Sequence, residues 1–120
     1  MASLQLGLLL LQVNRPVEAQ RCLESAVDHD PRSIELRSHL MMVFAQTGQN
    51  QKAIQQGEQL IRLDPQSFEA RFNLGLLFVA QRQFADGLAQ FLEAKKLRPE
   101  DPRLLPQIQR AESALKMIRQ

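Results

Sequence analysis

Residues 68–99 read FEARFNLGLLFVAQRQFADGLAQFLEAKKLRP, and this stretch decides the fold. Its apolar residues recur at three- and four-residue steps on both sides of the polar break QRQ at residues 81–83. That spacing predicts two amphipathic helices. Pro99 ends the second helix, because proline has no amide hydrogen to donate and restricts the residue before it. No segment of the sequence alternates apolar and polar residues long enough to predict a strand.

The prolines that close such segments are evenly spaced along the chain. They are Pro31, Pro65 and Pro99, and the segments that lead to them are VDHDP, IRLDP and KLRP. The same spacing, which we call the repeat interval, joins three further series of apolar or small residues: Leu6, Leu40 and Leu74; Leu10, Phe44 and Phe78; Ala19, Ala53 and Gly87. A period of this length is typical of a helical repeat array. The sequence therefore predicts the same two-helix unit three times.

These residues resemble the motif of the tetratricopeptide repeat family, which has Leu-Gly in the first helix, small and bulky residues in the second, and a closing proline. The third unit matches the motif at Leu74, Gly75, Gly87, Phe91, Ala94 and Pro99. The first unit matches it at Leu6, Gly7, Ala19, Leu23, Ala26 and Pro31. The second departs at Met41, Gly57 and Leu60, where large and small residues exchange places and can keep the core volume constant. The resemblance implies an all-α fold, a right-handed solenoid of antiparallel helix pairs, with repeats at about residues 2–33, 34–67 and 68–101.

After the third repeat the register continues only in part. Ile108 lies one repeat interval after Leu74, but Gln109 replaces the glycine of that series. A helix at about residues 104–119 would have one apolar face, formed by Ile108, Ala111, Leu115 and Ile118. Repeat arrays need such a half-polar helix to cover their last apolar surface. The first repeat, in contrast, begins almost inside its first helix, so we interpret the chain as the C-terminal part of a longer array.

The resemblance also assigns the residues that face the concave groove, which the first helices line in this family. The apolar members are Leu4, Leu8, Leu11, Met42, Phe72, Leu76 and Val79. Gln5, His39 and Asn73, which follow one another at the repeat interval, add side chains that can hydrogen-bond to a peptide, although Asn is also simply common at this position in the family. An apolar trough of this kind marks an interaction surface and suits an amphipathic helix or an extended peptide. The basic clamp of chaperone-binding members is replaced by Leu4, Leu8 and Ser38.

The segment LQLGLLLLQ at residues 4–12 is apolar on nearly every side. It is too short to cross a bilayer, which needs about 20 apolar residues. No Lys or Arg precedes it, so a signal peptide is not favoured. Core packing accounts for one side of this helix only. The other sides predict contact with a neighbouring repeat, with a ligand or with a second copy of the chain. The last option makes self-assembly our alternative function, with a homo-oligomer formed through the uncapped first helix.

The composition excludes several other classes of protein. With 15 Lys and Arg against 13 Asp and Glu in 120 residues, the net charge of +2 gives no nucleic-acid footprint. The single cysteine, Cys22, excludes an internal disulfide, offers no zinc-binding spacing and favours a reducing compartment such as the cytoplasm. His29 lies seven positions after Cys22 on one predicted helix, a rise of about 10 Å, which is too far for a catalytic pair.

We therefore predict a non-catalytic protein–protein interaction module, an adaptor or assembly scaffold, without cofactor or metal. Its expected ligand is an apolar or amphipathic segment of a partner protein, bound in the groove. Nucleic acid and membrane insertion are not expected.

Overall fold

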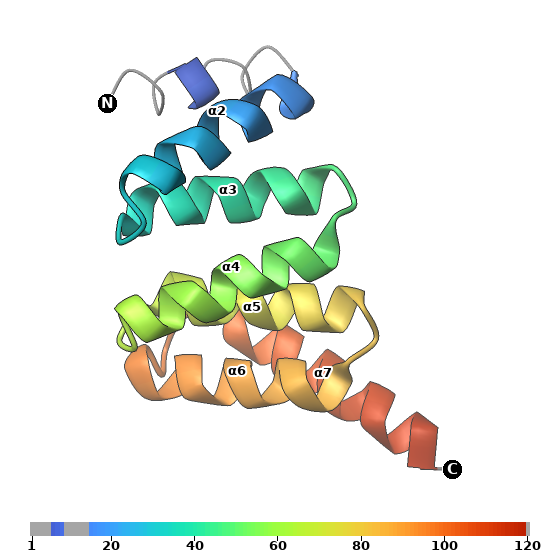
Figure 1. Ribbon diagram of the computed structural model, residues 1–120. Coiled ribbons are helices and arrows are strands. Elements are labelled where there is room, and N and C mark those ends of the chain that lie inside the picture. The colour runs from blue at the N-terminus through green and yellow to red at the C-terminus, as the bar shows by residue number, and fades with distance from the viewer. Residues whose placement is uncertain (1–5, 9–14, 120) are drawn as a thin grey trace. The chain divides into compact units, whose positions relative to one another are not determined.

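The computed structural model describes residues 6–8 and 15–119, with side chains as far as Ile118 (Figure 1). Residues 6–8 are helical, and six helices of 13 to 16 residues, α2 to α7, follow them. Within these described ranges there is no strand. The protein is all-α, in agreement with the periodicity of its apolar residues.

The helices belong to two compact units. The first unit, Met1–Asp64, contains α2 (Pro16–His29), α3 (Ile34–Gln46) and α4 (Asn50–Leu63). The second unit, Pro65–Gln120, contains α5 (Phe68–Ala80), α6 (Phe84–Leu97) and α7 (Leu104–Arg119). In the first unit α3 packs against α2 and α4, and in the second α6 packs against α5 and α7. Figure 1 shows that short loops join consecutive antiparallel helices within each unit.

The helices α3 and α5, which are the first helices of the pairs α3–α4 and α5–α6, are each capped by a serine. The Ser33 hydroxyl accepts a hydrogen bond from the Leu36 amide at 3.2 Å, and the Ser67 hydroxyl accepts one from the Ala70 amide at the same distance. Each bond satisfies an amide at the start of a helix that has no partner within the helix. The two serines are separated by the repeat interval, so the repeat extends to the capping interactions.

The turns inside the two pairs also share one backbone geometry. Gly48 has φ of 75°, and Arg82, one repeat interval later, has φ of 61°. In both turns the next amide bonds back to a helical phenylalanine, from Gln49 to the Phe44 carbonyl and from Gln83 to the Phe78 carbonyl, each at 2.8 Å. A left-handed residue after a helix allows this closure, and glycine adopts that conformation without steric cost.

Close helix contact in the second unit depends on Gly75. A Cβ atom built on Gly75 would lie 2.6 Å from the Phe91 ring, so only glycine lets α6 approach α5 this closely. The same relation recurs in the first repeat, where a Cβ on Gly7 would lie 3.0 Å from Leu23 Cγ. In the second repeat the residues at these two positions are Met41 and Gly57, both buried. In this repeat the large residue, Met41, lies on the first helix of the pair, and the glycine lies on the second.

Two arginines, one on α3 and one on α5, bond each of these helices to neighbouring segments of its own unit. Arg37 donates through Nε to the Pro31 carbonyl at 2.7 Å and through a terminal nitrogen to Gln56 Oε1 at 2.9 Å. Arg71 repeats this pattern in the second unit, with Pro65 at 3.2 Å and Gln90 at 3.3 Å. Each arginine therefore joins the loop before its helix to the second helix of the pair. We call this set the arginine clamp.

The second unit has an aromatic core that α7 covers. Leu104 and Ile108 of α7 are buried with Phe68, Phe72 and Phe91. The ring of Phe72 lies 5.8 Å from that of Phe68 and 5.7 Å from that of Phe91, measured between centroids. These three aromatic side chains form the hydrophobic core around which α5, α6 and α7 pack.

Arg103 fixes the start of α7 to α5. Its guanidinium donates to both carboxylate oxygens of Glu69, at 2.9 and 3.3 Å, and lies 4.9 Å from the centre of the Phe72 ring. It also donates to both oxygens of Asp101 at 3.0 Å, and these hydrogen bonds hold the pKa of the Asp101 carboxyl below its ordinary value. The same bonds, first with Asp101 and then with Glu69, raise the pKa of Arg103. The guanidinium is therefore charged throughout the accessible pH range.

Candidate partner-binding surface

His39 and Met42, the predicted site residues of α3, lie on one face of that helix. Met42 is 49% exposed, and Ser38, Ala45 and Gln46 are exposed beside it, while His39 is half-buried. We call this face, residues 38, 39, 42, 45 and 46, the α3 strip. Its charge is low, because none of the five residues is Lys, Arg, Asp or Glu. The strip can therefore contact an apolar segment without separating an ion pair.

His39 of the α3 strip has a ring nitrogen without a hydrogen-bond partner. Its Nδ1 atom is covered and has no hydrogen-bond partner within the described part of the chain. Buried polar atoms usually have a partner, so this nitrogen is an exception; because it is covered, only the remaining exposed part of the half-buried ring can meet a ligand. Ser38, its neighbour, is already paired, since its hydroxyl donates to the Ile34 carbonyl at 2.8 Å.

In the second unit, the corresponding face of α5 is formed by Asn73, Leu76, Val79 and Ala80, which we call the α5 strip. Asn73 and Ala80 are exposed, whereas Leu76 and Val79 are half-buried and pack against the aromatic core. The strip therefore offers one amide and part of two aliphatic side chains. Since the aliphatic residues also support the core, substitutions there affect both stability and contact.

Phe72 is placed differently from the sequence-based expectation. It is only 6% exposed and belongs to the core beneath α7 and Arg103. The physical reason is that Phe72 shares one buried cluster with Leu104 and Ile108, neither of which is close to it in the sequence. In this conformation Phe72 supports the α5 strip from below and presents almost no surface of its own.

The predicted groove residues of the first repeat are described only in part. Leu8 is half-buried, and its neighbour Leu6 is 49% exposed. Leu4, Gln5 and Leu11 lie outside the described residues. The arrangement of the leucine-rich segment therefore remains a prediction, as does the series formed by Gln5, His39 and Asn73.

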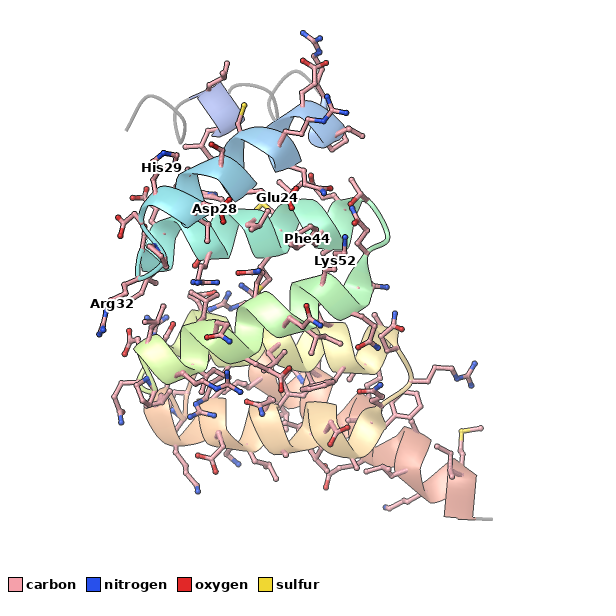
Figure 2. All side chains as sticks on the ribbon, viewed as in Figure 1. Glu24, Asp28, His29, Arg32, Phe44 and Lys52 are labelled. Atoms are coloured by element: carbon pink, nitrogen blue, oxygen red, sulfur yellow. The ribbon has the colours of Figure 1, made fainter. Side chains whose placement is uncertain are left out.

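The groups considered for catalysis are not brought together. His29 Nδ1 donates to the Ser25 carbonyl of its own helix at 2.8 Å, and the ring is exposed at the end of α2 (Figure 2). Cys22 is a half-buried free thiol. Across residues 6–8 and 15–118, no three His, Cys, Asp or Glu side chains gather as metal ligands. None of the described helices has the length and apolar character needed to cross a membrane.

Sequence reasoning missed the interactions that hold the strips in place. The arginine clamp fixes both first helices, and in the first unit Lys52 Nζ lies 5.8 Å from the centre of the Phe44 ring, linking α4 to α3 (Figure 2). The clamp had a signal in the sequence, because its arginine, proline and glutamine all recur at the repeat interval. The cation–π pair had none, since position 86 in the next repeat is Asp.

Antiparallel helix pairs, capped at equivalent serines and closed by equivalent turns, define a helical-repeat solenoid. The tetratricopeptide repeat profile matches residues 4–68 and 42–102, and the chain belongs to this family. The family consists of protein-interaction modules and is generally non-catalytic. Among curated proteins, none matches the chain by sequence.

Solved structures of similar fold include two of the protein MamA, with TM-scores of 0.87 and 0.89 at 19% and 21% identity. Each comparison covers 95% of this chain and 62% of the MamA chain, so this chain spans less than two thirds of that protein. The first tetratricopeptide repeat domain of Spaghetti (RPAP3), solved with the HSP90 peptide SRMEEVD, has a TM-score of 0.89 at 15% identity. That match covers 96% of this chain and 91% of the other. At these identities the likeness shows the fold alone.

Proposed function

We propose that the chain is a non-catalytic adaptor or assembly scaffold that binds an apolar or amphipathic segment of a partner protein on its α3 and α5 strips. The observation that carries this proposal is the exposure of Met42 on a helix whose opposite side is already buried. Leu36, Leu40, Val43 and Phe44 fill the core side of α3. A helix that is apolar on more than one side has a second surface to cover.

The chemistry of the strips suits such a ligand. Met42 has a flexible and polarizable side chain that adapts to different apolar partners. Asn73 and His39 can hydrogen-bond to a peptide and fix its register. Family membership supports protein binding, and the Spaghetti domain was solved with a peptide bound. An acidic C-terminal tail is not the expected ligand here, because Leu8 and Ser38 stand where the resemblance would require a basic clamp.

The test is affinity capture from a lysate of the source cells, with proteins identified by mass spectrometry. Met42→Glu and Asn73→Glu, made together, place charge on both strips without altering a fully buried side chain. Leu92→Glu is the matched control, because Leu92 is 44% exposed but lies on α6 and outside both strips. We expect the partner to be lost by the double variant and kept by the control.

Retention of the partner by the double variant at unchanged affinity would refute the assignment to the strips. Circular dichroism of each variant establishes beforehand that its helices are intact. Leu76→Glu is a useful third variant only if its unfolding midpoint is unchanged, since Leu76 packs against the core. An affinity loss of about tenfold or more is expected for a charge buried in an apolar contact.

Self-assembly is the second candidate, and the exposure of Leu6 near the start of the chain favours it. Leu6 is 49% exposed, and Val17 at the start of α2 is also exposed. In this alternative a second copy covers the apolar residues and no foreign peptide binds there. Sedimentation equilibrium separates the two, because a mass that rises with concentration and falls after Leu6→Glu supports self-assembly.

A further inference from the structure

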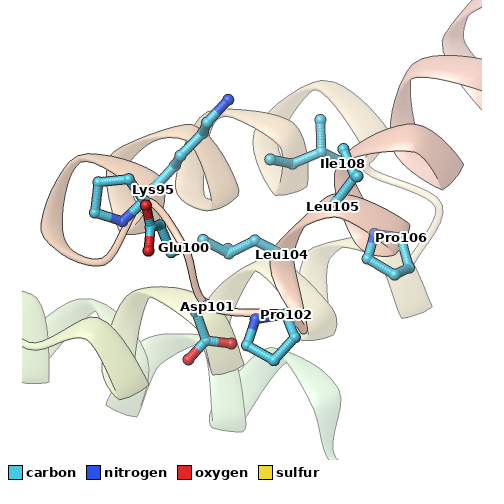
Figure 3. A pocket seen from close by; sticks show the side chains of 9 residues that line it. Lys95, Glu100, Asp101, Pro102, Leu104, Leu105, Pro106 and Ile108 are labelled. Atoms are coloured by element: carbon cyan, nitrogen blue, oxygen red, sulfur yellow. The ribbon is translucent and has the colours of Figure 1, made fainter.

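A second candidate site lies in the second unit, at the corner between the end of α6 and the start of α7, and its lining includes no residue of either strip. It is a cavity of about 490 Å³, shown in Figure 3. Its apolar lining comes from Leu104, Leu105 and Ile108 and from Pro99, Pro102 and Pro106. Its charged lining residues are Lys95, Glu100 and Asp101. Asp101 is bonded to Arg103, whereas neither Lys95 nor Glu100 forms an ion pair with a residue in the described ranges. We call it the α6–α7 pocket.

The internal repeat shows what kind of group fits such a place. Three lining residues, Pro99, Glu100 and Leu105, lie one repeat interval after Pro65, Gln66 and Arg71. Those earlier residues line a smaller cavity of about 260 Å³, whose other wall is the last turn of α6, with Glu93, Lys96 and Leu97. In the preceding repeat, therefore, the residues equivalent to Pro99, Glu100 and Leu105 face the C-terminal turn of a helix, α6.

The α6–α7 pocket departs from its counterpart at two of these three positions, with Glu100 in place of Gln66 and Leu105 in place of Arg71. Arg71 of the earlier cavity is held by the Pro65 carbonyl and by Gln90, as part of the arginine clamp. The equivalent residue, one repeat interval later, is Leu105, which is 60% exposed and has no such polar role. At this position the lining is therefore apolar, and its cation is Lys95 on α6.

A second substitution limits how a helix can lie along α7. Gly75 lets Phe91 approach α5, and the residue one repeat interval after Gly75 is Gln109. Since Gln109 has a side chain at that point, a docking helix needs a small residue where α6 has Phe91. Phe91 precedes Leu97 by six positions, and Glu93 precedes it by four. A helix that docks on α7 as α6 docks on α5 should have its key residues at the same two spacings.

We propose that the α6–α7 pocket binds the C-terminal turn of an amphipathic helix from a partner protein. The helix carries a leucine that packs against Leu105, a glutamate four residues earlier that pairs with Lys95, and a small residue six positions before the leucine. Lys95 can pair with this glutamate, because it has no ion-pair partner among the described residues. Glu100 is also unpaired and would repel a second carboxylate, so the equivalence with the last turn of α6, rather than the charge of the lining, favours this occupant.

The test uses a synthetic peptide of known sequence as the probe. The peptide has the sequence of α6, Phe84–Leu97, with Phe91→Ala, and a lactam bridge between two solvent-facing positions holds it helical. It is titrated into the full ¹⁵N-labelled chain and followed by amide chemical shifts. We expect saturable shifts at the amides of residues 95, 100, 101, 103–105, 107 and 108, the prolines of this segment having no amide hydrogen. An absence of saturable shifts, or shifts confined to the α3 and α5 strips, overturns the proposal.

Variants distinguish docking at the α6–α7 pocket from nonspecific binding of the probe. Leu105→Glu should weaken binding of the probe by about tenfold, since it places a charge in the apolar contact. Leu92→Glu, at a similarly exposed leucine of α6, should leave the affinity unchanged. Lys95→Glu should weaken binding about threefold and be restored when the probe carries Lys in place of its glutamate. Equal binding by Leu105→Glu and the unmodified chain contradicts the site.

A second copy of the chain is the competing occupant, and sedimentation equilibrium identifies it. The proposal expects a monomer whose mass is unaffected by Leu105→Glu. A dimer that dissociates in the Leu105→Glu variant would show that the pocket is filled by another copy, and would overturn the assignment to a partner helix.

Discussion

At the scale of single residues, the turn between α5 and α6 contains a residue with a strained backbone conformation. Arg82 has φ of 61°, and the equivalent residue of the preceding repeat is Gly48, with φ of 75°. A side chain disfavours this left-handed conformation, whereas glycine does not. Arg82→Gly should therefore raise the free energy of unfolding by about 0.5 to 1 kcal/mol, as measured by urea denaturation followed by circular dichroism.

Arg82→Ala is the control for this prediction. It removes the charge but keeps the Cβ atom, so the free energy of unfolding should stay within about 0.5 kcal/mol of the unmodified value. An equal gain in both variants would show that the charge of Arg82, rather than its backbone conformation, limits stability.

Arg71 is the second residue whose role can be tested alone. It joins the Pro65 carbonyl to Gln90, and Arg71→Ala leaves the glutamine without this donor. We expect a loss of about 1 kcal/mol in the free energy of unfolding, because the charged hydrogen bonds are partly exposed. Arg71→Lys should not restore it, since lysine lacks the planar fork that reaches two acceptors.

Arg110→Ala is the matched control, because Arg110 is exposed on α7 and outside the clamp. Its unfolding midpoint in urea should be unchanged. If Arg110→Ala and Arg71→Ala lower the midpoint equally, the effect reflects net charge, and the clamp contributes nothing of its own.

At the scale of helix pairs, the exchange of Met41 and Gly57 is the informative feature. The equivalent pairs are Gly75 with Phe91 and, in the first repeat, Gly7 with Leu23, where glycine lies on the first helix. Gly57→Phe should overpack the α3–α4 contact and cost about 1 to 3 kcal/mol of the free energy of unfolding. Adding Met41→Gly should recover part of this loss, because it recreates the arrangement of the third repeat.

A double-mutant cycle measures this compensation. The two substitutions should couple favourably by about 1 kcal/mol or more in urea denaturation. Additive losses would mean that the two positions do not share space, and that the volume exchange suggested by the sequence has another origin.

The same scale shows how far the sequence could predict the structure. The repeat interval and the three- and four-residue apolar steps predicted the helix pairs and the family, and the profile match confirms the family. Exposure was harder to predict, because it depends on contacts between distant segments. Phe72 has the sequence position of a groove residue, yet it is buried in one cluster with Leu104 and Ile108. The α6–α7 pocket was not foreseen, since it depends on how α7 leaves α6.

At the scale of the whole molecule, fold and function have different determinants. The repeat motif fixes the solenoid through glycines, caps and core residues, which are shared by many proteins with different partners. The exposed residues that would choose a partner, Met42, Asn73 and Leu105, lie outside that motif. They can change without disturbing the fold, so binding specificity must be measured on them directly.

In a repeat array each unit contacts only its neighbours, so stability is nearly the sum of local terms. The second unit has its own aromatic core, closed by α7 and by the Arg103 bonds to Glu69. We therefore predict that residues 65–120 fold without the first unit, giving a helical circular dichroism spectrum and a cooperative thermal transition. The matched variant is Phe91→Ala, which removes a fully buried ring and should cost about 3 to 5 kcal/mol. A domain this small has little stability in reserve, so that variant should be unfolded at room temperature. A fragment that lacks helical structure while the full chain is folded would show that the first unit is required.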